Sequence, residues 1–254
     1  MFTNIRYIFL TALRDRLFWA MLIGVLGSSI IAHMLGATAS INTAEMTLSY
    51  SSNSARIMII VGLVIFACFH LRNAFDSHEI DVFLSRPITR ANLLISYWFG
   101  FAFVAFLHAA ATIALLALQG VINWQGFFFW SLSLLLECWL VVAIALFAAF
   151  TIRSAVISVV ASMGLYLFAR MIAFFIATAN SGFLFEKQWV NYVLQYSLKG
   201  ISTLIPRMDF FTKSDWLING IKDYGDLKLF ALQAAIYIPL LLWAAIADFR
   251  RKQF

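Results

Sequence analysis

Two ionisable residues lie inside long apolar runs that could each cross a membrane as a helix. Glu137 lies ten residues into the run 127–150, and Arg170 lies fifteen residues into the run 155–179. A charged group at the centre of a membrane helix costs roughly 2.5–3.5 kcal/mol on insertion scales and usually faces a protein interior or a polar cavity. The two runs would cross in opposite directions, so we expect both residues at similar depth, as a buried pair. The pair is either a polar point on a substrate path or a structural contact, with a snorkelling Arg170 as a further alternative.

The four histidines are the other candidates for chemistry: His33, His70, His78 and His108. Together with Glu137, His33 and His108 could serve an intramembrane haem or metal centre. The histidines fall at different depths of the expected helices, so separate hydrogen-bonded or interfacial roles are the alternative. The sequence has no Cys-x-x-Cys, no His-Glu-x-x-His and no Gly-x-x-x-x-Gly-Lys-[Ser/Thr] motif. The chain alone therefore cannot hydrolyse ATP through a phosphate-binding loop.

The segment 72–92 combines acidic and apolar residues in a pattern that predicts a short amphipathic helix and a rigid turn. Its acidic residues are Asp76, Glu79 and Asp81, and its apolar residues are Phe75, Ile80, Phe83 and Leu84. Pro87 should end the helix because it disfavours helical backbone at Arg86, and Thr89 is a suitable N-cap for the next helix. A partner protein could push such a helix. The alternative is an ordinary solvated loop.

The composition places all these residues in a membrane protein. Of the 254 residues, 63% are apolar and 12% are charged, and the mean hydropathy is +0.89. A soluble domain of this size could not bury so much apolar surface, and disorder needs the opposite composition. Two cysteines inside apolar runs exclude a disulfide-stapled secreted domain. The net charge of +6 comes largely from Lys and Arg beside apolar runs, so we attribute it to membrane orientation and not to nucleic-acid binding.

Six apolar runs are candidates for membrane-spanning helices, which need about 20 residues. They are 17–35, 57–71, 93–118, 127–150, 155–179 and 229–247, the second extending in both directions through Ala55 and Phe75. The short connections with most Lys and Arg lie on the same side as both termini, which predicts cytoplasmic termini. We therefore predict an all-α, multi-pass membrane protein with residues 1–254 as one domain.

Other segments are expected outside the six spans. Residues 1–16 are amphipathic and predict an interfacial helix, with a simple extension of the first span as the alternative. Residues 36–54 are rich in Ser and Thr and predict a short outer loop. Within the longer outer loop 180–228, residues 189–204 predict an interfacial or re-entrant helix.

Small residues recur every four positions in two of the spans, which favours close helix packing. This packing could join helices within one chain or two copies in a dimer. The residues are Gly24, Ser28, Ser154, Ser158 and Ser162.

The stretch Glu79–Arg90 (EIDVFLSRPITR) resembles the cytoplasmic loop of type-two ATP-binding-cassette (ABC) export permeases. In that family an acidic residue and a short spacer often precede Leu-Leu-Ser-x-Pro-[Ile/Val]-[Ser/Thr]-Arg. The chain departs from the family where Glu-x-Gly-Thr is common, because Ile80, Asp81 and Val82 follow Glu79. The number of spans, the entry helix and the longer outer loop before the last span also resemble half-size bacterial permeases, such as that of the nitrous-oxide-reductase maturation transporter.

The resemblance implies a permease homodimer in the bacterial inner membrane, with two copies of a separate ATPase subunit that bind ATP and Mg. No cofactor and no covalent chemistry would belong to this chain, which would not itself be an enzyme. Glu137 and Arg170 would lie on the transport path, and an apolar path fits a lipid-like or amphipathic cargo. Contact with the ATPase would fall to Asp76, Glu79, Phe83, Leu84, Arg86, Pro87 and Arg90.

Within this coupling set, Phe83 and Leu84 would enter a groove of the ATPase. Glu79 and Arg86 would set the register, since charges determine orientation more than affinity, and Pro87 would link the helix rigidly to the third span. Two rival functions remain: an intramembrane haem- or metal-handling protein, and an ion-coupled transporter in which Glu137 titrates.

Overall fold

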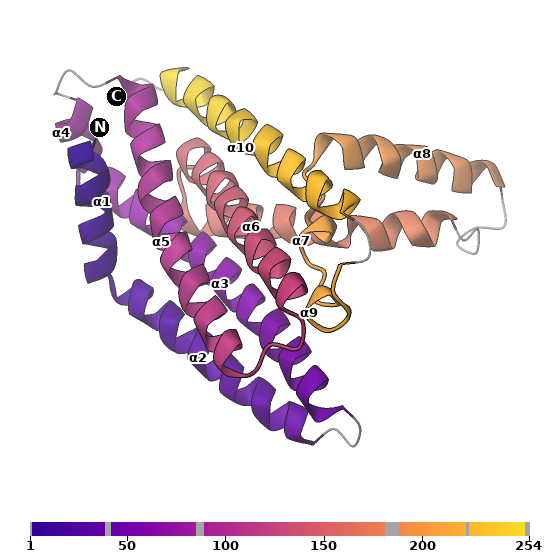
Figure 1. Ribbon diagram of the computed structural model, residues 1–254. Coiled ribbons are helices and arrows are strands. Elements are labelled where there is room, and N and C mark those ends of the chain that lie inside the picture. Colours follow the sequence, from indigo (N-terminus) through magenta and orange to yellow (C-terminus); the bar gives the residue numbers. More distant parts are fainter. Residues whose placement is uncertain (1, 39–41, 85–88, 181–187, 222–223, 252–254) are drawn as a thin grey trace.

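The computed structural model describes residues 2–38, 42–84, 89–180, 188–221 and 224–251, which form helices joined by short turns (Figure 1). Six helices within these ranges are long and apolar enough to cross a membrane, which confirms the predicted all-α, multi-pass class. They are α2 (Arg16–Ala37), α3 (Thr43–Asp76), α5 (Arg90–Leu118), α6 (Trp124–Thr151), α7 (Ala155–Asn180) and α10 (Gly225–Arg251).

Helix α6 lies at the centre of the bundle and packs against α3, α5, α7 and α10 (Figure 1). In its most apolar stretch 72% of the residues are buried, against 22% in α7 and 17% in α10. A helix that is apolar on every face and enclosed on nearly every face forms the core of a bundle. The outward faces of α7 and α10 are therefore free to contact lipid or another protein.

Helix α1 (Phe2–Arg14) is separate from the first span and packs along the first half of α5. Ile8 is buried against Gly100, where an added Cβ would lie 2.7 Å from an Ile8 methyl carbon. The rings of Phe9 and Phe103 meet at 4.7 Å. Asp15 ends α1 and caps α2, its side chain accepting a hydrogen bond of 2.9 Å from the Leu17 amide. The predicted apolar face of this helix is thus covered largely by α5, and Tyr7 and Leu10 are the apolar residues that its described part exposes.

The expected outer loop 36–54 is wrong for most of its length, because α3 already begins at Thr43. Its hydroxyl and amide side chains bond to their own helix: Ser52 Oγ donates to the Ser49 carbonyl at 3.0 Å, and Asn53 Nδ2 donates to the same oxygen at 3.0 Å. Such bonds satisfy polar side chains without breaking a helix. The longer helix places Arg56 thirteen residues inside α3 and not at its end.

The tightest point of the α2–α3 hairpin gives a direct test of this packing. An added Cβ at Gly36 would lie 1.9 Å from Thr47 Oγ1 and 2.6 Å from the Thr47 Cα, whereas nothing lies within 4 Å of the same position at Gly27. We expect Gly36→Ala to lower the free energy of unfolding by about 1–3 kcal/mol. Gly27→Ala, on the same helix, should be neutral or stabilising by up to about 1 kcal/mol. Equal unfolding midpoints for the two variants in detergent would contradict this arrangement.

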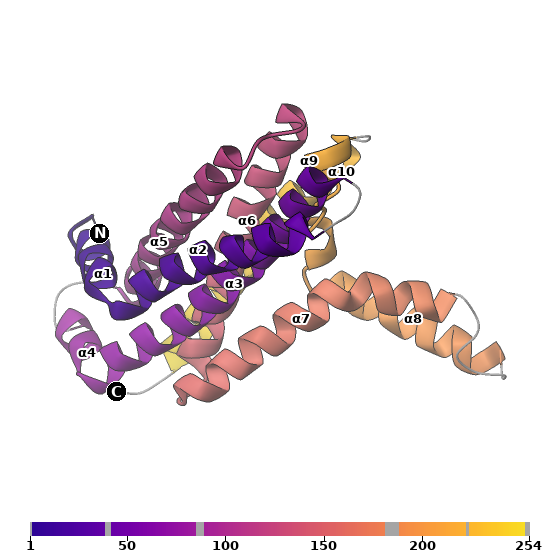
Figure 2. The same cartoon turned by 90° about the horizontal axis from the view of Figure 1, so that it is seen from below.

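Helix α8 (Gln188–Leu204) confirms the predicted amphipathic helix and continues through Gly200. It runs back beside α7, and the two helices project from the bundle as an arm (Figures 1 and 2). Residues 205–220, which we call the connecting segment, then return to the bundle. They contain the 3-10 turn η1 (Met208–Phe210) and the short helix α9 (Trp216–Asn219).

The connecting segment is more deeply packed than an outer loop. Met208 and Phe211 are fully enclosed, and Trp216 and Leu217 are 3% and 1% exposed. The Trp216 carbonyl lies so close to α6 that a Cβ at Gly126 would be 1.7 Å from its oxygen. The expectation of a long outer loop over 180–228 therefore misses a segment that belongs to the core.

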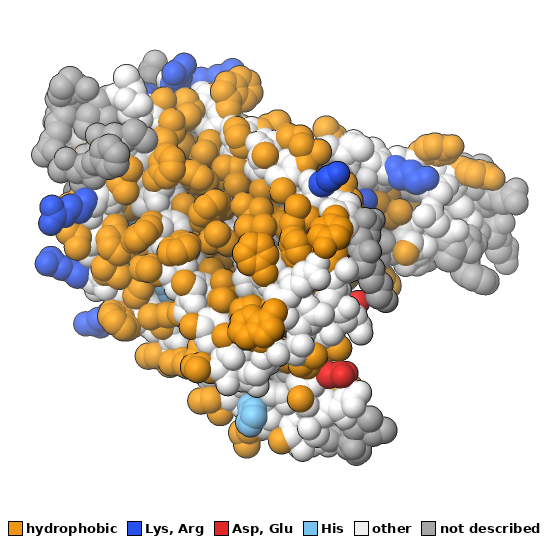
Figure 3. Space-filling view, in the orientation of Figure 1, with side chains coloured by type: hydrophobic (Ala, Val, Ile, Leu, Met, Phe, Trp, Pro, Cys, Tyr) orange, Lys and Arg blue, Asp and Glu red, His pale blue; other side chains and the backbone are white. Residues whose placement is uncertain are grey.

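Both termini and the short helix α4 (Glu79–Leu84) lie at the same end of the bundle (Figure 1). On the face that Figure 3 shows, apolar side chains cover the middle of the bundle, and many Lys and Arg side chains lie along the edge that carries the termini. This distribution fits a bundle whose apolar middle crosses the bilayer and whose terminal end is basic.

Candidate functional site

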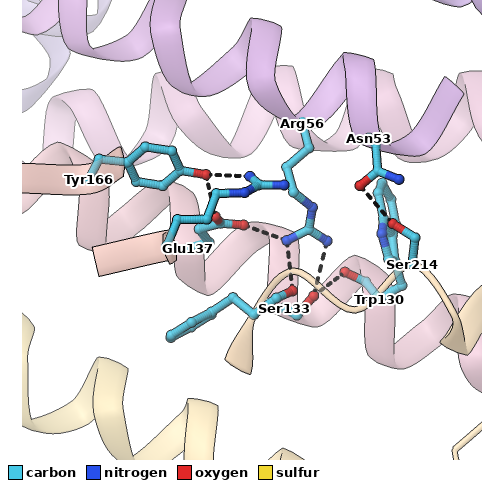
Figure 4. A network of polar contacts seen from close by, with 9 residues as sticks. Asn53, Arg56, Trp130, Ser133, Glu137, Tyr166 and Ser214 are labelled. Atoms are coloured by element: carbon cyan, nitrogen blue, oxygen red, sulfur yellow. Dashed lines mark hydrogen bonds and ion pairs between the residues drawn. The ribbon is translucent and has the colours of Figure 1, made fainter. Parts of the chain in front are cut away.

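A fully buried arginine organises the polar centre of the bundle. Arg56, on α3, is 0% exposed. Its Nη1 donates hydrogen bonds to the Glu137 carboxylate on α6 and, at 2.9 Å, to the Phe211 carbonyl of the connecting segment. Its Nη2 donates to Ser133 Oγ at 3.2 Å. The guanidinium also lies over the Trp130 ring, 4.8 Å from the centroid (Figure 4), so a single side chain contacts successive turns of α6 and also holds the connecting segment.

Helix geometry explains why Arg56 and Glu137 meet. Each lies thirteen residues after the first residue of its helix, which is about 20 Å along the axis at 1.5 Å per residue. Helices α3 and α6 pack against each other over much of their length. Two opposite charges at this depth avoid the cost of an isolated buried charge because each has a partner and further hydrogen bonds.

The predicted direct pair between Glu137 and Arg170 is wrong, because Tyr166 lies between them. The Tyr166 hydroxyl donates to Glu137 Oε1 at 2.9 Å, and Arg170 Nη1 donates to that hydroxyl oxygen at 2.7 Å. Tyr166 and Arg170 are four residues apart, so they share one face of α7. Glu137 is buried, whereas Arg170 is partly exposed. The network therefore joins α3, α6, α7 and the connecting segment through one carboxylate and one guanidinium.

Two donors in this centre have no acceptor within the described part of the chain: Arg56 Nε and Trp130 Nε1. Both belong to side chains with 0% exposure. A buried donor without an acceptor carries a desolvation cost. In the polar centre, both carboxylate oxygens of Glu137 therefore accept hydrogen bonds, whereas Arg56 and Trp130 each keep one donor that the described residues leave unsatisfied.

The position of Tyr166 makes a prediction about Arg170. Because Arg170 reaches the carboxylate only through the Tyr166 hydroxyl, Arg170→Ala should cost about 0.5–1.5 kcal/mol of stability, the value of an ordinary hydrogen bond. In a Tyr166→Phe background the same change should cost almost nothing, since the shared hydroxyl is already gone. A double-mutant cycle of unfolding free energies measures this. An equal cost of Arg170→Ala in both backgrounds would contradict the geometry.

The residues expected to contact a partner ATPase lie mostly around α4, which the structure forms as predicted. Thr89 caps α5, its side chain accepting from the Asn92 amide at 3.2 Å. Glu79 is half-buried and borders an open cleft of about 370 Å³ between α1, α3 and α4. The other residues of the cleft are Thr11, Arg14, Asp15, His70, Asn73, Ala74 and Ser77.

The apolar face of α4 turns partly onto its own chain. Ile80 is 1% exposed, and the Phe83 ring contacts that of Tyr7 on α1 edge-on, with 5.7 Å between centroids. Val82 is 59% exposed and, among the described apolar side chains of α4, is the one that faces outward. Phe83 is half-buried, so only part of its side chain is open to a partner, and its contact with an ATPase stays a prediction. The side chain of Leu84, and Arg86 and Pro87, lie outside the described residues.

Two other members of the coupling set have partners inside the chain. Asp76 is exposed and pairs with Arg72, one helical turn earlier, at 2.5 Å. Arg90 Nη1 donates to the Phe249 carbonyl at 2.9 Å and lies over the Phe249 ring. A cation at the last carbonyls of a helix stabilises its C-terminus, so Arg90 also ties the start of α5 to the end of α10.

Of the two alternatives for the small residues, packing within one chain or in a dimer face, the structure shows packing within the chain for three of the five. Ser158 and Ser162 are each 1% exposed, and Ser158 Oγ donates to the Ala148 carbonyl of α6 at 3.3 Å. Gly24 receives Met58 of α3, with an added Cβ 3.2 Å from its side chain. Ser28 and Ser154 are partly exposed. Close packing at these residues is real, but for Gly24, Ser158 and Ser162 it joins helices of one copy.

The histidines lie apart from the polar centre. His108 is buried, and its ring nitrogens lie 2.9 and 3.2 Å from the carbonyl oxygens of Val104 and Phe18. His33 is exposed and borders a pocket of about 390 Å³ with Gln119 at the opposite end of the bundle from α4. Among the described residues no group of three His, Cys, Asp or Glu side chains is arranged to hold a metal ion.

Comparison with known proteins identifies no relative of this chain among protein families or curated proteins. No protein-family model matches the chain, and no curated protein matches it. Functional inference therefore rests on the residues and their geometry.

The role of Arg56 is the main feature that the sequence alone did not indicate. Arg56 falls at the edge of the expected second span, and the Ser- and Thr-rich stretch before it is typical of a loop. A usable signal is present, however: Arg56 and Glu137 are each followed by a long apolar run within the same helix. Tyr166 has no comparable signal, since tyrosine is common in membrane helices.

Proposed function

We propose that the chain is the membrane-spanning permease subunit of an ABC exporter. Two copies would associate with two copies of a separate ATPase subunit, which binds ATP and Mg and hydrolyses the nucleotide. The chain itself would hold no cofactor and perform no covalent chemistry. The membrane would be the bacterial inner membrane, with both termini in the cytoplasm.

The observation that carries this proposal is helix α4 and its surroundings. A six-residue helix between two spans, at the end of the bundle that holds both termini, is placed to receive a push from a soluble partner. Val82 offers it an apolar contact, and Glu79 offers it a charge beside the cleft. The same residues begin the stretch Glu79–Arg90 that resembles the export-permease loop.

The way α4 is attached supports transmission of such a push. Ile80 is buried and Phe83 contacts Tyr7, so α4 is packed onto both α3 and α1. Arg90 joins the next span to the end of α10. A displacement of α4 would therefore reach α1 and α3 directly, and conformational steps of this kind commonly gate turnover.

The cargo class is proposed from the surface of the bundle. Large apolar side chains are exposed along α7 and α10, including Val160, Phe174, Leu232, Leu240 and Trp243. A path bordered by such surfaces suits a lipid-like or amphipathic cargo, and the same surfaces suit contact with lipid and with the second copy.

Affinity purification tests the proposal. The full chain, tagged and isolated from native membranes in mild detergent, should bring with it a chain that carries a phosphate-binding loop and hydrolyses ATP, in a one-to-one ratio. Charge reversal by Glu45→Lys, in the first turn of α3 at the opposite end, should leave that ratio unchanged. Isolation of the chain as a stable assembly free of any nucleotide-binding subunit would contradict the proposal.

A further inference from the structure

The connecting segment lies against the polar centre of the bundle. Its apolar side chains are buried there, and a few single polar contacts link it to α3 and α6. Phe211 is fully buried, and its carbonyl accepts from Arg56 at 2.9 Å. Ser214 Oγ donates to Asn53 Oδ1 of α3 at 2.9 Å (Figure 4). Trp216 presses its carbonyl against α6 at Gly126. These contacts join a largely non-helical stretch of chain to α3 and α6.

The residues that lie against the segment are the polar ones of the bundle interior. Arg56, Ser133 and Glu137 are all 0% exposed in the presence of the segment. Figure 4 shows Arg56 and Ser133 meeting beside the loop of the segment, with Ser214 and Asn53 next to them. If the segment left, this group of charged and hydroxyl side chains would face open space between α3, α6 and α10.

Two buried donors beside the connecting segment also lack hydrogen-bond acceptors among the described residues. Arg56 Nε and Trp130 Nε1 lack acceptors within the described ranges, and buried donors of this kind favour rearrangement toward water. Two ion pairs involve the segment: Arg207–Asp209 near its start, and Lys213–Asp226, which links it to α10. Both are partly exposed, and exposed pairs contribute little to stability. The Arg56–Glu137 pair is therefore the strongest polar contact on which the closed arrangement depends.

We propose that the connecting segment is a plug over a polar path and that the Arg56–Glu137 pair holds it closed. The pair fixes the guanidinium so that Nη1 can bind the Phe211 carbonyl. When the pair opens, Arg56 is free to turn, the plug loses its polar contact at the Phe211 carbonyl, and water reaches the polar centre. This inference goes beyond the proposed function and concerns this chain alone, so its failure would leave the ATPase partnership untouched.

Cys138 provides a reporter that the chain already contains. It follows Glu137 on α6 and is fully buried. The substitution Cys68→Ala removes the other cysteine, so that a thiol reagent reports on Cys138. In the purified full chain, a water-soluble maleimide should modify Cys138 very slowly. Glu137→Gln keeps the size of the side chain and removes its charge, and it should raise the rate at least about tenfold. The control Arg72→Gln removes a partly exposed ion pair near the end of α3 and should leave the rate unchanged.

A distance measurement shows whether the plug itself moves. Spin labels at Asp215 on the plug and at Leu118 on α5, both exposed, are introduced as cysteines with Cys68 and Cys138 replaced by alanine. Glu137→Gln should shift the distance distribution and broaden it, whereas Arg72→Gln should not. Ser214→Ala, which removes only the contact with Asn53, should give a smaller change of the same kind and serves if Glu137→Gln does not fold.

Two results would overturn the proposal. One is a Cys138 modification rate that stays at the wild-type value in folded Glu137→Gln, or in Ser214→Ala where the first variant does not fold. The other is faster modification of Cys138 with an unchanged distance between positions 118 and 215, because the polar centre would then open without movement of the plug.

Discussion

Replacing Arg56 by alanine is expected to lower the free energy of unfolding by about 3–5 kcal/mol, the cost of leaving a buried charge without its partner. Glu137 would then lie buried with only the Tyr166 hydroxyl as donor, and the Phe211 carbonyl would lose its donor as well. Glu137→Ala should be similarly costly, because the guanidinium would remain enclosed. Unfolding of the purified chain in mixed micelles measures both.

A double variant shows whether Arg56 and Glu137 stabilise the fold as a pair or independently of each other. Arg56→Met with Glu137→Leu replaces the charges by apolar side chains of similar volume. The double variant should cost clearly less than the sum of Arg56→Met and Glu137→Leu measured singly. A matched control at the partly exposed Arg72–Asp76 pair should change stability by no more than about 1 kcal/mol. Strict additivity at positions 56 and 137 would mean that the pair does not form.

Disruption of α4 is the second change with a large expected effect. Val82→Asp places a charge on an exposed apolar residue of α4, and Glu79→Lys reverses the charge beside the cleft. Both sites are partly open to solvent, so the chain should still insert and fold. Each variant should nevertheless lose the ATPase subunit on purification, because an unpaired charge at a buried contact costs several kcal/mol.

The measurement for α4 is subunit stoichiometry after affinity purification, with Glu45→Lys as the matched charge reversal at the opposite end. Phe83→Ala is a poorer probe, since Phe83 also supports the packing of α1 through Tyr7. Val82→Asp and Glu79→Lys complexes that keep a full complement of ATPase would show that α4 is not the contact.

The spans were predictable because an apolar run of about 20 residues matches the thickness of a bilayer and is too long for most buried helices of soluble domains. The start of α3 was not predictable, because Ser49–Ser54 has the composition of a loop. In the structure its hydroxyl groups bond to carbonyls of the preceding turn, and α2 packs against this part of α3. Helix α4 and the cap at Thr89 followed from local rules on proline and N-caps, which act within a few residues.

The candidate site was only half predictable. An ionisable residue in an apolar run marks Glu137 as unusual, but the identity of its partner depends on which helices are neighbours. One sequence does not contain that information: α3 and α7 both border α6, and the choice of Arg56 over Arg170 is decided by Tyr166. The buried Phe211 and Trp216 were missed for a related reason, because the polar composition around them predicts an exposed loop.

We propose that this chain works with an ATPase through α4, and ATP hydrolysis by the complex in vesicles tests this partnership most directly. The wild-type complex should hydrolyse ATP at a rate that depends on the permease chain, and complexes assembled with Glu79→Lys or Val82→Asp should fall to the rate of the ATPase alone. Glu45→Lys should behave as wild type. Hydrolysis that is the same with wild-type chain, with either α4 variant and without the chain would contradict the account.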